Sequence, residues 1–127
     1  MQLSRAQFDQ MLAQARADVP LETCGLLAGR DGRVERVLPV PNVLGSPVEY
    51  RMDGQEFADA MIACSFEPLA IYHSHPAGPP APSPTDIAQA FYPDSIYVII
   101  SLAQEPPSAR AFQIVQGQVT EVECEVV

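Results

Sequence analysis

The chain has 127 residues, of which 47% are hydrophobic and 18% are charged. These values are typical of a globular protein, and the length predicts a single domain over residues 1–127. Seven arginines and no lysine stand against sixteen acidic residues, so the net charge is −9, which argues against nucleic acid as a partner. Five of the thirteen prolines lie between Pro76 and Pro84, and this concentration needs a local explanation.

The cysteines and the lack of long apolar runs bear on the cellular compartment. Cys24, Cys64 and Cys124 are odd in number and widely spaced, which disfavours a disulfide framework and a cysteine-rich zinc site. No stretch approaches the roughly eighteen uninterrupted apolar residues of a membrane span, and the N-terminal segment lacks the apolar run of a secretion signal. We therefore expect a cytoplasmic protein with no membrane partner.

The N-terminal segment has the pattern of an amphipathic helix. Ser4 and Gln7 form a capping-box pair, and the apolar residues from Phe8 to Ala15 recur at helical spacing. Because a proline follows soon after, the helix should run to about Asp18.

Two β-rich segments come next, at 23–30 and 33–40. The two residues between them, Asp31-Gly32, are a strong signal for a tight hairpin. We therefore expect an antiparallel pair of strands.

A loop, a short strand and a second helix are expected between the hairpin and the middle of the chain. Residues 39–47 have the composition of a loop, and residues 48–52 read as a short strand. Asp53 and Glu56 then have the spacing of a helix start, and apolar residues follow at helical intervals.

The middle of the chain predicts the core of the fold. Residues 68–75 and 96–102 are mainly apolar and read as strands buried on both faces. Between them lie the proline-rich loop and a short helix expected at 84–91. A strand, a crossover helix and a second strand favour parallel pairing, which makes the core α/β.

The C-terminal segment predicts two more strands joined near Gly117. In the last of them, Val122, Cys124 and Val126 should face the core, and the alternating glutamates should face solvent. The expected fold is thus an α/β domain with a mixed β-sheet flanked by helices.

The chain's two histidines, His73 and His75, are one residue apart at the end of a predicted strand, so both side chains project from one face. Asp86 lies eleven residues beyond His75, on the first turn of a predicted helix. Two imidazoles and a carboxylate suit an open zinc site whose fourth position is left for water. The alternatives are a hydrogen-bonded strand end for the histidines and helix capping for Ser83 and Asp86.

Two motifs resemble the JAMM (MPN+) zinc metalloproteases. The segment HSHPAGPPAPSPTD matches that family's signature of His, one residue, His-Pro, six residues, Ser, two residues and Asp. The upstream segment PLETCGLLAGR is similar to the family's first motif, in which an acid precedes a Cys-Gly-Leu-Leu strand. The resemblance covers most of the chain and implies the MPN architecture, which is similar to that of cytidine deaminases.

The resemblance also implies a role for each site residue. His73, His75 and Asp86 are expected to bind Zn²⁺, which lowers the pKa of a water ligand toward about 7. Glu22 is the implied general base and acid, and Ser83 the implied hydrogen-bond donor to the oxyanion. Without the motif, Glu22 reads as a solvated surface charge. Capping and catalysis are expected to compete for the Ser83 hydroxyl.

The family cleaves amide and isopeptide bonds after the tails of ubiquitin-like proteins, and its short bacterial members often act on sulfur carriers. We therefore expect a protein substrate whose extended Gly-Gly tail lies beside an edge strand. The segment 42–52 is a candidate flexible flap, with an ordinary surface connection as the alternative. Cys24 is expected to pack in the core, since both histidines are assigned to the metal and none remains to activate a thiol.

The same residues bear on other possible functions. A non-catalytic MPN-type scaffold should lack a metal ligand, and none is missing here. The RadC-like branch has a similar histidine pattern and was once linked with DNA repair, but the net charge of −9 weighs against it. A zinc deaminase needs H-x-E and P-C-x-x-C elements, which are absent. A small-molecule zinc amidase of the same fold stays open, as does the oligomeric state.

Overall fold

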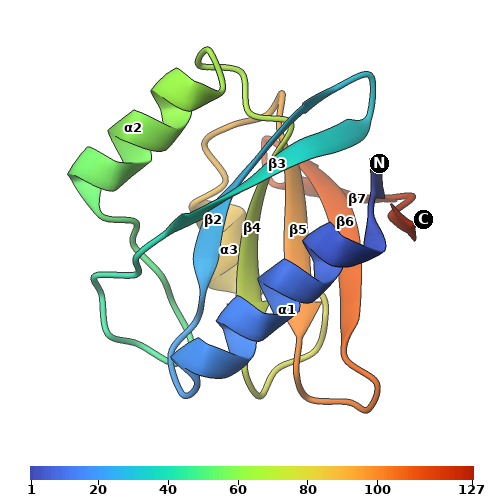
Figure 1. Ribbon diagram of the computed structural model, residues 1–127. Coiled ribbons are helices and arrows are strands. Elements are labelled where there is room, and N and C mark those ends of the chain that lie inside the picture. Colours follow the sequence, from blue (N-terminus) through green and yellow to red (C-terminus); the bar gives the residue numbers. More distant parts are fainter.

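The computed structural model describes all residues, Met1–Val127. Its elements in chain order are β1 (Gln2–Leu3), α1 (Arg5–Asp18), β2 (Cys24–Arg30), β3 (Arg33–Val40), α2 (Gly54–Ala63), β4 (Ala70–His75), α3 (Pro84–Ala88), β5 (Ile96–Ser101), β6 (Ser108–Val115), β7 (Gln118–Val122) and β8 (Glu125–Val126) (Figure 1). None of the helices has the length and hydrophobicity that a membrane crossing requires.

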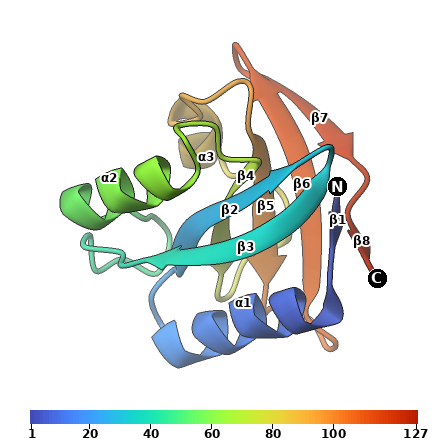
Figure 2. The same cartoon turned by 45° about the horizontal axis from the view of Figure 1, so that its top comes forward.

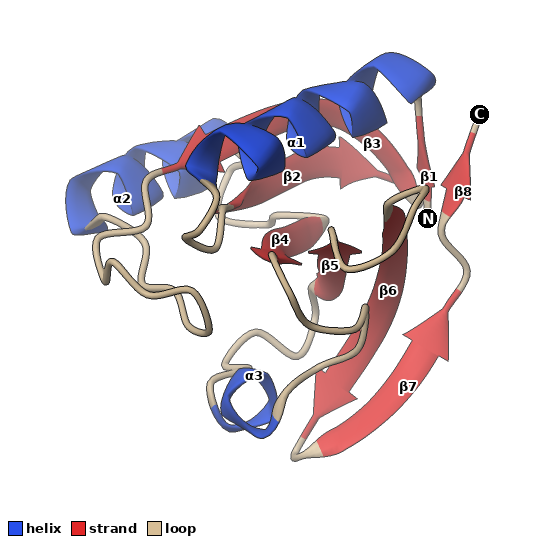
Figure 3. Ribbon diagram, turned by 90° about the horizontal axis from the view of Figure 1, so that it is seen from below, coloured by secondary structure: helices blue, strands red, loops and turns tan.

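All strands belong to one mixed sheet in the order β7-β6-β5-β4-β2-β3-β1-β8. β4 and β5 pair in parallel, as the crossover predicts, and they are flanked by the antiparallel pairs β2–β4 and β5–β6. Figure 3 shows that the sheet curls strongly between β2 and β7. The predicted class, an α/β domain with a mixed sheet flanked by helices, is confirmed.

Each face of the sheet carries its own apolar core. On one face Phe8 and Met11 of α1 pack with Tyr72 of β4 and its neighbours. On the other face Ala60 of α2 packs with Ile71 and with side chains of β2, β5 and β6. Figure 2 shows the β2–β3 hairpin passing between α1 and α2. Because β4 is covered on both faces, its alternating side chains are all buried.

The first helix has the predicted start and end. Ser4 accepts a hydrogen bond from the Gln7 N–H, and the Gln7 side chain accepts one from the Ser4 N–H, which completes the capping box. Gln14, farther along α1, donates to the Cys24 carbonyl at 3.0 Å and accepts from the Tyr72 hydroxyl. These two bonds fix the helix over β2 and β4, so the predicted helix is confirmed and its position explained.

The predicted hairpin is also confirmed. β2 and β3 pair in antiparallel fashion from Cys24↔Val40 to Arg30↔Arg33. The two turn residues have positive φ angles, 53° at Asp31 and 72° at Gly32. Aspartate and glycine tolerate this conformation, which suits the right-handed twist of the strands.

Two expected boundaries in the middle of the chain were wrong. Residues 48–52 form no strand, because the main chain there is bonded to the Asn42 side chain and only Met52 makes an isolated bridge. The helix expected at 84–91 ends at Ala88. Phe91 is 74% exposed, so no burial of its side chain stabilises a further turn.

The C-terminal expectation was partly wrong. β6 and β7 form the predicted hairpin around Gly117, but β7 ends at Val122, and a separate strand, β8, pairs with β1. Cys124 packs against the core as expected, whereas Val126 is 36% exposed. The sequence pattern missed β1, because a two-residue strand is too short to show an alternation, and it assigned the residues of β8 to one strand with β7.

Gly25 of β2 leads to a prediction about stability. A Cβ atom added there would lie 2.6 Å from the Leu38 carbonyl oxygen and still closer to the Tyr72 hydroxyl. Since the Leu38 backbone is held in the sheet, we expect Gly25→Ala to lower the free energy of unfolding by about 1–3 kcal/mol or more. Urea denaturation measures this change, and Gly54→Ala is the matched control, because open space surrounds that glycine. Equal stability of the two variants would contradict the prediction.

Candidate metal centre and active-site cleft

Strand β4 places both histidines on one face of the sheet at its carboxyl end. His73 lies opposite Cys24 of β2 and Ile99 of β5, and His75 lies two residues farther along, opposite Ser101. Both side chains are buried, with exposed fractions of 1% and 8%. The predicted common orientation of the two imidazoles is confirmed, since their Nε2 atoms are 3.2 Å apart.

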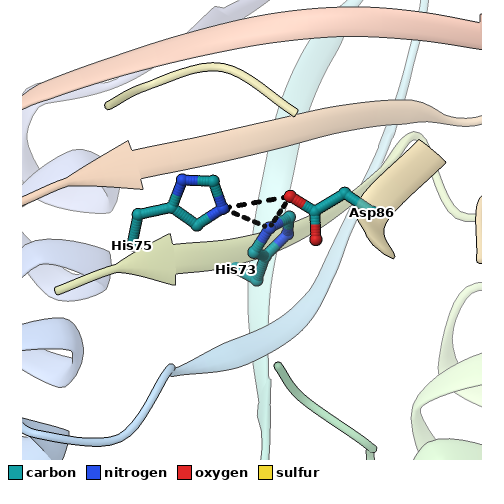
Figure 4. A group of neighbouring side chains, drawn as sticks. All are labelled: His73, His75 and Asp86. Atoms are coloured by element: carbon teal, nitrogen blue, oxygen red, sulfur yellow. Dashed lines mark hydrogen bonds and ion pairs between the residues drawn. The ribbon is translucent and has the colours of Figure 1, made fainter. Parts of the chain in front are cut away.

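Helix α3 brings Asp86 to the same point (Figure 4). Its Oδ2 atom lies 3.2 Å from His73 Nε2 and 3.0 Å from His75 Nε2. Ser83 caps the helix, and Asp86 Oδ2 accepts the Ser83 N–H at 2.9 Å. The three side chains therefore offer converging ligand atoms that could hold a metal ion.

The charges of the three groups follow from burial and mutual contact. Burial lowers the pKa of His73, which favours the neutral imidazole. Burial, the largest single effect, also disfavours the charged forms of His75 and Asp86, but the hydrogen bonds and opposite charges around each group together outweigh it. The pKa of His75 is therefore raised, and that of Asp86 lies well below its usual range because both histidines bond to it. Asp86 is thus a carboxylate at neutral pH.

The proline-rich loop is fixed to the sheet by two hydrogen bonds. His75 Nδ1 donates to the Pro79 carbonyl at 2.7 Å, and Ser101 Oγ donates to the Gly78 carbonyl at 2.6 Å. A carbonyl can only accept, so the first bond places a proton on Nδ1 and directs Nε2 of His75 to the cluster. The stiff loop thereby orients a histidine as well as connecting β4 to α3.

Glu22 reaches the cluster through the pairing of β2 with β4. Beyond Cys24↔His73, the pairing continues with two bonds: the Ser74 N–H donates to the Thr23 carbonyl, and the Thr23 N–H donates to Ser74 Oγ. Glu22 then lies beside His75, is 2% exposed, and has no hydrogen-bond partner for Oε1. Burial raises its pKa to about 7. The alternative reading of Glu22 without the motif, as a solvated surface charge, is therefore excluded.

A cleft of about 530 Å³ opens over these groups. Its floor contains Glu22 and His75, and one wall is the proline-rich loop. Pro47 and Val48 of the loop between β3 and α2 line the cleft as well. The lining residues are Glu22, Pro47, Val48, His75, Ala77, Gly78, Pro79, Ala81, Pro82, Ser83 and Pro84. The cleft is mainly apolar, with titratable groups concentrated at its floor.

Ser83 also lines the cleft, and its hydroxyl is less committed than expected. As helix cap, Ser83 Oγ accepts the Asp86 N–H at 3.1 Å, which uses one lone pair. A hydroxyl has one O–H donor in addition to two lone pairs. The cap by itself therefore does not prevent the Ser83 O–H from donating to a ligand.

Other expectations about this region had mixed outcomes. Cys24 is buried, its thiol donates to the Val40 carbonyl, and burial raises its pKa to about 12, so it is an inert core residue as predicted.

The sequence reasoning missed Tyr50, whose ring stacks on His73 with a centroid distance of 4.8 Å. It also missed Asn42, which bonds to the main chain of Glu22. No local pattern marks either residue, since both contacts join distant segments.

Comparison with known proteins agrees with this geometry. Residues 4–115 match the family described as prokaryotic homologs of the JAB domain. A CysO-cysteine peptidase of Mycobacterium tuberculosis is 43% identical over 92% of this chain and 84% of its own length. A probable TtuB-protein conjugate cleaving protease of Thermus thermophilus is 41% identical over 90% of this chain and 76% of its own.

Solved structures show the same fold. A protein from Desulfitobacterium hafniense superposes with a TM-score of 0.88 at 40% identity and covers 99% of this chain and 92% of its own. A JAB1/MPN domain protein from Archaeoglobus fulgidus superposes with a TM-score of 0.68 at 23% identity, over 100% and 99% of the two chains. These matches confirm the expected MPN architecture and the resemblance to JAMM proteins. The chain belongs to the family of prokaryotic homologs of the JAB domain, and it is a hydrolase.

Proposed function

We propose that residues 1–127 form a single catalytic domain, a zinc peptidase that cuts the bond after the C-terminal tail of a ubiquitin-like or sulfur-carrier protein. The observation that carries the proposal is the convergence of His73, His75 and Asp86 beside a buried, unpaired Glu22. The names of the two relatives guide the choice of substrate class, since one is a CysO-cysteine peptidase and the other a probable protease that cleaves TtuB-protein conjugates. The bond cut is a peptide or an isopeptide bond.

The three ligand atoms fit the geometry of zinc. Zn–N and Zn–O bonds of about 2.0–2.1 Å in a tetrahedron require neighbouring ligand atoms about 3.3 Å apart. The separations among the Nε2 atoms and Asp86 Oδ2 are 3.0 to 3.2 Å. Two imidazoles and one carboxylate leave a fourth position open, as in catalytic rather than structural zinc sites. Zinc held there supplies Lewis-acid chemistry, which polarises a carbonyl and lets water react as a nucleophile near neutral pH.

Glu22 acts as the general base and acid in this proposal. Its carboxylate is buried at the floor of the cleft, and its Oε1 atom has no competing hydrogen bond. Burial raises its pKa to about 7, so the group can accept a proton and release it again near neutral pH. It takes a proton from the attacking water and delivers one to the amine that leaves.

Ser83 donates its O–H to the oxyanion that forms at the scissile carbonyl. We expect Ser83→Gly to lower kcat by about 10²- to 10³-fold, the usual cost of losing such a donor. Glycine at a helix N-cap costs only a few tenths of a kcal/mol, so this variant removes the hydroxyl but keeps the helix start. Initial rates of cleavage by the zinc-loaded variant test the prediction, with its zinc content as the control. Full activity of Ser83→Gly would contradict the assigned role.

The substrate's tail is expected to enter the cleft in extended form beside an edge of the sheet. The outer edge of β3 is a candidate, because β1 pairs with it only at Gln2↔Arg33. An extended Gly-Gly tail has no side chains and fits main-chain hydrogen bonding of this kind. The negative charge of the chain favours a carrier with a basic surface around its tail.

The deciding experiment is cleavage of sulfur-carrier proteins extended by a short peptide beyond Gly-Gly. Incubation with the zinc-loaded protein should release the extension, EDTA should stop the release, and added Zn²⁺ should restore it. A carrier whose tail ends in Ala-Ala before the same extension is the matched control. If no carrier fusion from the same genome is cleaved, the carrier substrate is rejected in favour of a small-molecule amidase.

A further inference from the structure

The loop between β3 and α2, for which the sequence left a flexible flap and an ordinary surface connection open, is closed at its base. Asn42 and Met52 form an antiparallel bridge, and the Val43 N–H donates to the Arg51 carbonyl at 2.8 Å. The Asp53 N–H donates to the Pro41 carbonyl at 3.0 Å. We refer to residues 42–52 as the 42–52 loop.

The side chain of Asn42, the chain's only asparagine, organises this loop from within. Its Nδ2 group donates to the carbonyls of Glu22 and Glu49, at 3.0 and 3.3 Å. Its Oδ1 atom accepts the N–H groups of Leu44 and Arg51, both at 3.0 Å. A carboxamide has two donors and two acceptor lone pairs, so every hydrogen-bonding position of Asn42 is used.

The 42–52 loop holds the main chain of Glu22 on both sides. Asn42 Nδ2 binds the Glu22 carbonyl, and the Glu22 N–H donates to the Ser46 carbonyl at 3.2 Å. By contrast, Oε1 of the Glu22 carboxylate has no hydrogen-bond partner. The position of the carboxylate in the cleft is therefore set through its backbone, and the loop supplies part of that constraint.

The same loop also covers one of the metal-site histidines. The Tyr50 ring stacks on the His73 ring with an interplanar angle of 27°. A metal-binding histidine usually donates a hydrogen bond from the N–H of its second ring nitrogen to a partner, which fixes the ring. His75 does so through the Pro79 carbonyl, but Nδ1 of His73 has no partner. The ring of His73 is instead held by stacking.

A polar contact ties the loop to the third element of the site. Gln89, at the end of α3, donates from Nε2 to Glu49 Oε1 at 3.0 Å. The 42–52 loop thus touches the Glu22 segment, His73 on β4 and the helix that carries Asp86. The three partners of the loop lie in separate parts of the chain.

We propose that Asn42 is a positioning residue, which holds the 42–52 loop closed so that the loop fixes the backbone of Glu22 and, through Tyr50, the ring of His73. The proposal rests on the proposed roles of Glu22 and His73. Displacement of a reacting group by about 1 Å can cost about 10²-fold in rate, so Asn42 can control kcat although it does not itself line the cleft.

The first arm of the test addresses Glu22. Asn42→Asp keeps an oxygen for the Leu44 and Arg51 N–H groups but cannot donate to the Glu22 carbonyl. We expect kcat on the carrier fusion to fall at least about 10-fold with little change in KM, since the base rather than substrate binding is disturbed. Val43→Ala, in the same loop and exposed, is the control. Wild-type kcat in Asn42→Asp would overturn this part of the proposal.

The second arm addresses His73 and needs no substrate. Tyr50→Phe keeps the stacked ring, whereas Tyr50→Leu removes it. Competition with a chromophoric chelator should show a zinc affinity about 10-fold weaker for Tyr50→Leu and near the wild-type value for Tyr50→Phe. Equal zinc affinities for the two variants would overturn the role of Tyr50. Because this arm measures zinc alone, it distinguishes failure of the loop proposal from failure of the proposed peptidase function.

A third measurement covers the case in which a variant folds poorly. Hydrogen exchange of the Leu44 and Arg51 amides reports directly on the bonds to Asn42. In Asn42→Ala these amides should exchange faster while the amides of β5 stay protected. Unchanged exchange of the two loop amides would contradict the claim that Asn42 holds the loop closed.

Discussion

Glu22→Gln is expected to lower kcat of the zinc-loaded enzyme by about 10²- to 10⁴-fold, the usual contribution of a general acid–base group. Glutamine has nearly the same shape as glutamate but cannot accept the proton of the attacking water. The His73, His75 and Asp86 side chains are unchanged, so the variant should bind zinc as the wild type does. Initial rates on a carrier fusion, together with the measured zinc content, test this expectation.

The pH dependence of kcat in the wild type and in Glu22→Gln provides a second test. Burial raises the pKa of Glu22 to about 7, and a bound cation lowers it, because opposite charge favours the carboxylate. As the pH falls through this pKa, Glu22 gains a proton and can no longer act as a base. Wild-type kcat should therefore drop on the acid side, at or below about pH 7, and this limb should be missing from the residual activity of Glu22→Gln.

Glu67→Gln is the matched control, since Glu67 is exposed and lies near the start of β4, at the end of the strand away from the histidines. It should keep wild-type activity and the wild-type pH profile. The metal-free Glu22→Gln protein should unfold at the same or a higher temperature above pH 7, because an ionised carboxylate no longer has to be buried. A zinc-loaded Glu22→Gln protein with full activity would refute the assigned role.

Asp86→Asn is expected to remove zinc and, with it, activity. Asparagine retains an oxygen for the Ser83 N–H, so the helix start is preserved, but it lacks the negative charge that suits a zinc ligand. Removing a residue that hydrogen-bonds to a metal ligand weakens metal affinity about 10- to 100-fold. Removing the ligand itself should therefore weaken zinc affinity more than about 100-fold. Chelator competition and metal analysis of the purified protein measure the change.

His73→Ala should behave like Asp86→Asn, and Asp94→Asn, an exposed aspartate in the turn before β5, should keep wild-type zinc affinity. Unchanged zinc content in both Asp86→Asn and His73→Ala would reject the metal site. Loss of zinc together with a lower melting temperature in Asp94→Asn would instead indicate a general folding defect.

Several features could be predicted from the sequence because their causes are local. The capping box of Ser4 and Gln7, the Asp31-Gly32 turn and the start of α3 at Ser83 each depend on residues within a few positions of one another. The common orientation of His73 and His75 follows from the period of two in a strand. The parallel pairing of β4 and β5 follows from the helical crossover between them.

The errors have physical reasons as well. Residues 48–52 have strand-like composition, but their backbone bonds go to a side chain of the same loop, which no alternation pattern reveals. The expected helix at 84–91 ends early because Phe91 finds no surface to pack against. β1 and β8 form only because the two ends of the chain meet.

The sequence by itself determined the order of the main elements, the group of two histidines and an aspartate, and the family. These are encoded in short motifs and in periodicities that act over a few residues. Only the tertiary structure decided that Glu22 is buried beside His75, that Ser83 can cap and still donate, and that Asn42 and Tyr50 belong to the site. Each of these depends on contacts between distant segments of the chain, brought together by burial of the two cores on the faces of the sheet.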